Sequence, residues 1–225
     1  MSLNLNNIPG GGGKKFTPQA NIAPGTYPAR VVQLIHLGLQ AQRPYRGVDK
    51  PPAQELMVTY ELVDEFMKDE AGKDIEDKPR WISETFPLHS LDNEKARSTA
   101  RYHVFDPTGD VLKGDITKII CLPCNVTVVN NASGDKVYDN VGNLSAMRPR
   151  DAMQCPELKN PPKVFLCDDP DIEVFKSLPK WIQEKITSNL NFKGSKLEAL
   201  IGNAPKEVAK PAEKKVEETV SNNPY

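Results

Sequence analysis

Short apolar segments with a period of two run along the middle of this chain, and that period is typical of β-strands with one buried face. It is clearest over residues 55–63, where Leu56, Val58, Tyr60 and Leu62 alternate with Met57, Thr59 and Glu61. We predict five strands, over residues 27–37, 55–63, 80–88, 119–129 and 136–147. An acidic stretch around Gly72 joins the second strand to the third, and residues 130–135 form a turn between the last two.

Two segments follow a helical pattern instead. Residues 92–105 begin at Asp92, a residue type that caps helix N-termini, and continue with Lys95, Ala96, Arg97, Ala100 and Arg101. Residues 171–189 carry apolar side chains at mostly helical spacing, namely Ile172, Phe175, Leu178, Trp181, Ile182 and Ile186. Pro179 interrupts this second segment, so we expect a short first turn and a longer second helix.

These elements favour a mainly β fold. Five strands with a short helix between the third and the fourth is the order of a five-stranded OB-fold-like barrel, followed here by a C-terminal helical segment. A jelly roll or a small β-sandwich with further, unrecognised strands would give the same visible pattern.

The two ends of the chain differ in composition from its middle. Residues 1–23 include four consecutive glycines, Gly10 to Gly13, and residues 204–225 alternate Lys, Glu, Ala, Pro and Val without large apolar clusters. Such segments bury too little apolar surface to offset the entropy of ordering. We predict a disordered Gly-rich arm over 1–23, an OB-fold-like domain over 24–150, a C-terminal extension over 151–203 whose helix packs on the barrel, and a disordered tail over 204–225.

Charge and targeting signals narrow the class of protein. The 225 residues carry a net charge of −1, so any nucleic-acid surface must be a local patch rather than a global field. The sequence opens without a cationic start and apolar run, and no stretch approaches the ~20 apolar residues of a membrane span. We therefore expect a cytoplasmic protein with reduced cysteines and no membrane partner.

The most pointed candidate chemistry lies between the first two predicted strands. Arg43, Tyr45, Arg46 and Lys50 follow one another closely there, between Pro44 and Gly47. Arginine offers bidentate contacts to phosphate, and tyrosine offers a flat face on which a base stacks. The loop predicts a nucleic-acid contact, and the alternative is a solvated loop whose charges serve solubility.

Cations and aromatic side chains recur together on other predicted elements. Further candidates for DNA binding are Arg80, Trp81, Arg97, Arg101, Tyr102, Lys136, Tyr138 and Arg148. Interleaved cations and aromatics are what a sequence-tolerant groove for a single strand requires. The alternative for Trp81 and Tyr138 is a place in the core.

Metal and catalytic signatures are weak in this sequence. Four cysteines, Cys121, Cys124, Cys155 and Cys167, could in principle ligate zinc, but the last two are twelve residues apart and the first two lie in an apolar strand-like run. His36, His89 and His103 share no metal-ligand spacing, and the glycine run lacks the spaced Gly-Lys-Ser/Thr of a phosphate loop. Asp168, Asp169 and Asp171 are explained by a helix N-terminus. We predict no enzyme, no cofactor and no catalytic residue.

Several short segments resemble single-stranded DNA-binding proteins of tailed bacteriophages. They are Pro24-Gly25-Thr26-Tyr27-Pro28-Ala29-Arg30-Val31-Val32, Leu37-Gly38, Tyr60-Glu61-Leu62, residues 136–141, residues 146–149 and Leu178-Pro179-Lys180-Trp181-Ile182. The resemblance spans roughly residues 24–192. It implies an OB-fold that coats single-stranded DNA during phage replication and recombination in the infected host cell, without enzymatic activity.

The tail departs from what that resemblance implies. Proteins of this kind commonly end in an acidic tail that recruits replication or recombination proteins, but here Lys206, Lys210, Lys214 and Lys215 offset Glu217 and Glu218. Two other functions remain open at this point. One is a phage structural protein of the capsid or tail built on a β-sandwich, and the other is a metal-dependent nuclease that uses the acidic segments.

Overall fold

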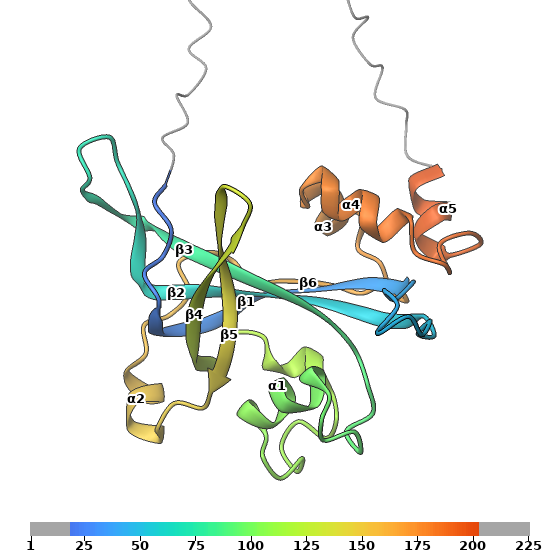
Figure 1. The fold of residues 1–225 in the computed structure, drawn as a ribbon, viewed down its shortest axis with the longest axis horizontal. Helices are drawn as coiled ribbons and strands as arrows, with labels where there is room; N and C mark the ends of the chain where they lie inside the picture. Colours follow the sequence, from blue (N-terminus) through green and yellow to red (C-terminus); the bar gives the residue numbers. More distant parts are fainter. Residues whose placement is uncertain (1–18, 203–225) are drawn as a thin grey trace, which may run out of the picture.

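Most of the chain folds around one curled antiparallel sheet. The computed structural model describes residues 19–202, so residues 1–18 of the predicted arm and the whole predicted tail lie outside the described residues. The five long strands are β1 (Gly25–Gln40), β2 (Ala53–Lys68), β3 (Asp74–Pro87), β4 (Pro123–Ser133) and β5 (Lys136–Ser145). Their order in the sheet is β3-β2-β1-β4-β5. Figure 1 labels each of these strands. The predicted mainly β class is confirmed.

The sheet is a half-barrel with Greek-key connections. β1, β2 and β3 follow one another as neighbours, and β4 then returns to pair with the first half of β1, from Gly25 to Arg30. The two outer strands β3 and β5 approach each other where Arg80 Nη2 lies 3.6 Å from the Asp139 carboxylate. The sheet therefore curls until its edges meet at one end.

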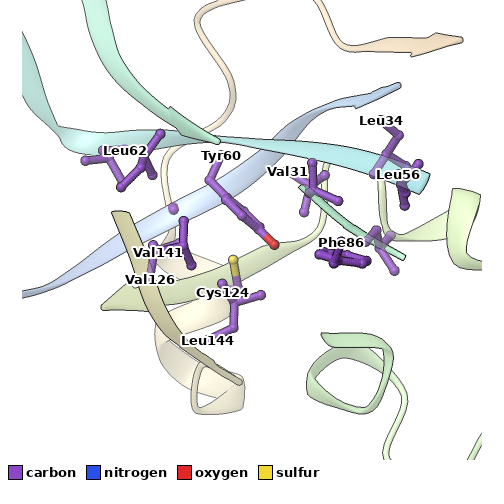
Figure 2. Close-up of a cluster of buried hydrophobic side chains, with 14 of the residues drawn as sticks. Val31, Leu34, Leu56, Tyr60, Leu62, Phe86, Cys124, Val126, Val141 and Leu144 are labelled. Carbon is purple, nitrogen blue, oxygen red and sulfur yellow. The ribbon is translucent and has the colours of Figure 1, made fainter. Parts of the chain in front are cut away.

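The concave face of the sheet holds the main core. Figure 2 shows Tyr60 reaching from β2 into the middle of this cluster, beside Cys124 of β4. The buried members supplied by the five strands are Ala29, Val31, Leu34, Leu56, Val58, Tyr60, Leu62, Ile82, Phe86, Cys124, Val126, Val128, Val141 and Leu144. The predicted period of two in β2 is confirmed, because its four alternating apolar residues all belong to this cluster. The opposite face of the strand is buried as well, at Met57, Thr59 and Glu61.

Strand boundaries differ from prediction at β4. Residues 119–122, predicted as its start, instead close the 3-10 helix η2 (Ile116–Ile119) and a turn in which Cys121 has a φ of 65°. Asp115 caps η2, because its carboxylate accepts a hydrogen bond of 3.0 Å from the Thr117 amide. Apolar side chains in this stretch pack on the core from a turn, which a pattern of apolar residues alone does not distinguish from a strand.

An α-helix, α1 (Arg97–Phe105), precedes η2 between β3 and β4 and packs near the open side of the half-barrel (Figure 1). The N-cap is Ala96, which makes no side-chain capping bond, so the prediction of Asp92 as the cap is wrong. Asp92 instead accepts a hydrogen bond from Ser90 Oγ in the preceding turn. Short polar residues serve turns as readily as caps.

The C-terminal extension covers the convex face of β1 and β2. It contains α2 (Pro149–Gln154), β6 (Lys163–Phe165), α3 (Ile172–Ser177), α4 (Lys180–Thr187) and α5 (Lys196–Gly202). β6 pairs in parallel with Gln33–Ile35 of β1. A second core forms between the sheet and the extension from Ile35, Leu37, Met57, Phe165, Phe175, Leu178, Ile182, Ile186 and Leu197.

The helical part of this extension agrees with prediction at its centre and differs at its margins. The predicted 171–189 segment is divided into α3 and α4 around Pro179, as expected. Trp181, which the helical spacing grouped with the apolar residues, is 59% exposed and does not belong to the second core. The short elements α2, β6 and α5 were not predicted.

The end of the predicted N-terminal arm packs on the protein. Ile22 is buried in the main core, and its backbone N–H donates to Asp139 Oδ2 at 3.0 Å. The Asn21 amide donates to Asp139 Oδ1 at 2.7 Å. Residues 19–23 are therefore part of the folded domain, contrary to the prediction that disorder extends to residue 23.

Across residues 19–202, none of the helices has the length and apolar character needed to cross a membrane.

Candidate nucleic-acid interface

The β1–β2 loop, residues 41–52, contains a small hairpin turn at its centre. The Tyr45 and Val48 backbones exchange two hydrogen bonds, of 2.9 Å and 3.0 Å. Arg46 and Gly47 between them both have positive φ, 52° and 78°, as a type I′ turn requires. The turn thus fixes the backbone under Tyr45 and places Arg46 at the tip of the loop.

Tyr45 lies among cations at the surface. Its side chain is 57% exposed. The Arg46 guanidinium carbon lies 5.3 Å from the centroid of the ring and the Lys50 Nζ lies 4.9 Å from it, within cation–π range. Arg43 is also exposed in this loop. The predicted cluster is therefore brought together as one exposed aromatic with neighbouring positive charge.

Two hollows lie between this loop, the end of β3 and α1. The first, of about 500 Å³, is lined by Leu39, Gln42, Lys50, Pro51, Pro52, Ala53, Gln54, Pro87, Leu88 and His89. The second, of about 390 Å³, is lined by Leu88, His89, Ser90, Leu91, Ser98, Tyr102, Gly114 and Ile116. They share Leu88 and His89, and neither lining contains a carboxylate. Their walls suit flat, uncharged groups better than cations.

Trp81 stands on the convex face of edge strand β3. It is 39% exposed, and Ser83 and Thr85 follow it on the same exposed face, while Ile82, Glu84 and Phe86 between them are buried. The indole Nε1–H donates to Glu61 Oε2 at 3.0 Å. Trp81 is therefore a fixed surface ring rather than a core residue.

Arg80 points the other way and has a structural partner. Its side chain is largely buried and pairs with Asp139 across the seam between β3 and β5. That carboxylate also accepts from Asn21, Ile22 and Asn130. A phosphate contact by Arg80 would break this seam, so the structure does not support its predicted place in the interface.

Arg101 and Tyr102, predicted to contact DNA, are buried and bonded within the protein. Arg101 makes two hydrogen bonds to the Glu84 carboxylate, of 2.7 Å and 3.0 Å. The Tyr102 hydroxyl donates to Asp106 at 3.1 Å and accepts from the Gly114 amide at 2.7 Å. Arg97, one turn earlier, is exposed, and its Nη1 lies 3.9 Å from Glu84 Oε2, a long distance for an ion pair. Arg97 therefore remains available for contact with a phosphate.

Burial also sets the protonation of the groups around Glu84. Burial, the nearby Glu84 carboxylate and the hydrogen bond between them raise the pKa of Tyr60 well above its usual value. The Tyr60 hydroxyl therefore stays protonated and donates to Glu84 at 2.9 Å. The Glu84 carboxylate is held by three donors and anchors α1 to the sheet.

The remaining predicted residues lie away from the β1–β2 loop. Lys136 and the half-exposed Tyr138 belong to the β4–β5 hairpin, and β4 ends beside the beginning of β1, whereas the loop follows the end of β1. Arg148 is exposed before α2 and pairs with Asp151 at 3.0 Å. The predicted residues therefore form separate patches, not one continuous groove.

The four cysteines do not gather into a metal site. Cys124 lies in the main core, and burial raises the pKa of its thiol far above the usual value. Cys167 packs against the second core, where burial raises the pKa of its thiol to about 12. Within residues 19–202, no group of three or more His, Cys, Asp or Glu side chains is placed to hold a metal ion.

Sequence reasoning did not propose three residues of this region as site residues. His89 lines both hollows, and the Glu61 carboxylate accepts from Trp81 and from Asn160 Nδ2 at 2.7 Å. Glu61 occupies an outward position of β2, where the alternation predicts contact with water, and nothing in the local pattern shows that a later segment covers it.

No family model matches this chain, and neither a curated protein nor a solved structure matches it significantly.

Proposed function

We propose that this protein binds single-stranded DNA without sequence preference and acts in phage DNA replication or recombination. The observation that carries the proposal is the β1–β2 loop. An exposed tyrosine ring has two cations within 5.3 Å of its centroid. One of these cations, Lys50, also lines a hollow without carboxylates. Base stacking and phosphate contact are the two interactions that a sequence-tolerant single-strand surface needs.

The fold supports the same proposal. A curled five-stranded sheet in the order β3-β2-β1-β4-β5, with a helix after β3, agrees with an OB barrel, in which the β1–β2 loop borders the oligonucleotide site. The acidic β2–β3 hairpin lies at the other end of β2 from this loop. Its acidic residues outnumber Lys68, Lys73 and Lys78, so the net negative charge repels a phosphate backbone and favours the loop end. The acids are Asp64, Glu65, Asp69, Glu70, Asp74, Glu76 and Asp77.

The test is a titration of the full-length protein with oligo-dT and with a duplex of equal length at several salt concentrations. We expect the single strand to bind more tightly, because stacking needs exposed base faces, and its affinity to fall steeply with salt as counterions are released. Equal affinity for the duplex, or no binding to either, overturns the proposal.

A further inference from the structure

We propose that Glu61 is a positioning residue that holds the Trp81 indole as a stacking platform for a base, and that segment 155–160 of the C-terminal extension completes this platform. The inference rests on the proposed function and adds a second contact surface, on the convex face of β3, to that of the β1–β2 loop.

Glu61 is a fully buried carboxylate. Within the described residues, all of its hydrogen-bond donors are uncharged groups. Its exposed fraction is 0%. Oε1 accepts from the Lys159 backbone N–H at 2.6 Å, and Oε2 accepts from Asn160 Nδ2 at 2.7 Å and from Trp81 Nε1 at 3.0 Å. A buried charge is costly unless its hydrogen bonds are satisfied, so these donors are held in place as firmly as the carboxylate itself.

Arg30 secures the same segment from the neighbouring strand. It stands directly opposite Glu61 in the β1–β2 register. Its largely buried guanidinium donates to the carbonyls of Cys155 and Pro156, at 2.9 Å and 2.7 Å, and to Glu157 at 3.1 Å. Two adjacent strands thus fix residues 155–160 on the convex face, one through a cation and one through an anion.

These contacts leave an aromatic ring at the surface, and the buried Glu61 carboxylate beneath it fixes its orientation. The Trp81 indole is 39% exposed while its N–H is tied to a buried acceptor. The exposed neighbours along β3, Ser83 and Thr85, are small. Lys159, which belongs to the covering segment 155–160, is also exposed. A ring already held in one orientation loses little entropy when a base stacks on it, and a lysine nearby suits the adjoining phosphate.

The test uses tryptophan fluorescence, because the chain has only two tryptophans. In a Trp181→Phe background, all tryptophan fluorescence comes from Trp81. We expect oligo-dT to quench its emission, and Trp81→Ala to weaken binding about fivefold or more. Glu61→Gln keeps the shape but sets an amide N–H₂ against a donor. It should lower the anisotropy of Trp81 in the free protein and weaken binding to a similar degree.

The double variant separates positioning from general damage. If Glu61 acts through the indole, Glu61→Gln with Trp81→Ala binds no worse than Trp81→Ala alone. Trp81→Phe keeps an aromatic ring but removes the N–H that bonds to Glu61. It tests the same contact if the Glu61 variant does not fold. It should lose part of the affinity and keep the circular dichroism spectrum of the parent, with a melting temperature lowered by the loss of one hydrogen bond to the buried Glu61.

Three results decide between the inference and the function on which it rests. Tight oligo-dT binding with unquenched Trp81 and normal affinity of Trp81→Ala overturns the platform and leaves the proposed function intact. Unchanged Trp81 anisotropy in Glu61→Gln overturns the positioning role. Absence of oligo-dT binding to the parent protein overturns the proposed function and the platform with it.

Discussion

Replacing Arg101 should destabilise the protein far more than replacing Arg97, although both arginines lie on α1 and face the same carboxylate. The Arg101 side chain is 6% exposed and makes two hydrogen bonds to Glu84, whereas Arg97 is 56% exposed and 3.9 Å away. Removing one partner of a buried ion pair costs about 3–5 kcal/mol, because the other charge stays buried. An exposed pair contributes about 0–1 kcal/mol.

Arg101→Ala should therefore lower the free energy of unfolding by about 3–5 kcal/mol, a large share of the ~5–15 kcal/mol that stabilises a typical domain. Arg97→Ala, the matched control, should lower it by about 1 kcal/mol or less. Urea denaturation followed by circular dichroism gives both values and shows whether the m-value has changed.

A third variant tests whether the unpaired charge of Glu84 causes the loss of stability in Arg101→Ala. Adding Glu84→Gln to Arg101→Ala removes that charge and keeps an oxygen to accept the Tyr60 hydroxyl, so part of the lost stability should return. Equal losses of stability in the two arginine variants would contradict the buried ion pair between Arg101 and Glu84. An Arg101→Ala variant that stays as stable as the parent and flattens the salt dependence of DNA binding would instead indicate an exposed phosphate contact.

Other predictions concern the surface, the N-terminus and pH. Tyr45→Ala should weaken oligo-dT binding by about 1–3 kcal/mol with little change in salt slope, and Arg46→Ala should reduce that slope by about one unit, in a titration that Tyr45→Phe controls. A chain cut to 24–202 should melt well below one cut to 19–202 in calorimetry, because it loses a buried isoleucine and three hydrogen bonds to Asp139 or from Asn130; equal melting temperatures would contradict the packing of residues 19–23. Burial opposes ionisation of Asp106, but hydrogen bonds from Leu112, Tyr102, Gly109 and Val111 outweigh it and hold the pKa of this carboxyl below its usual value. Its contribution to stability is thus complete above the unfolded pKa of about 3.9 and is lost as the pH falls through the lower folded value, so Asp106→Asn should flatten the acid limb of a stability–pH curve; an unchanged limb would argue against this role.

The sequence predicted the elements that a local pattern determines. Period-two alternation located the central part of β2 and the second half of β3, because inward Tyr60 and Ile82 meet the core while outward Trp81 meets solvent. Pro179 divided α3 from α4, since proline cannot continue a helix from its interior. The β1–β2 loop was also identified locally, because Arg46 and Gly47 sit in a turn that needs no distant contact.

Elements that depend on distant contacts were not predictable in the same way. β6 has three residues and exists as a strand because it pairs with Gln33, Leu34 and Ile35 of β1. Strand propensity is weak and context-dependent, so Lys163 to Phe165 carry no signal of this pairing. Ile22 is likewise buried by packing on strands far along the chain, although the residues around it resemble a polar arm.

The same limit explains the errors in the candidate site. Arg80 and Arg46 are the same residue type, and each stands beside an aromatic residue in the sequence. Arg80 nevertheless has an acidic partner on β5, while Arg46 lies over the ring of its neighbour Tyr45 at the surface. A cation contributes to a DNA site only if no carboxylate of the protein already holds it, and which carboxylates come near is set by tertiary structure. The free positive charge beside an exposed ring, rather than the number of arginines, is therefore what distinguishes the β1–β2 loop as the candidate interface.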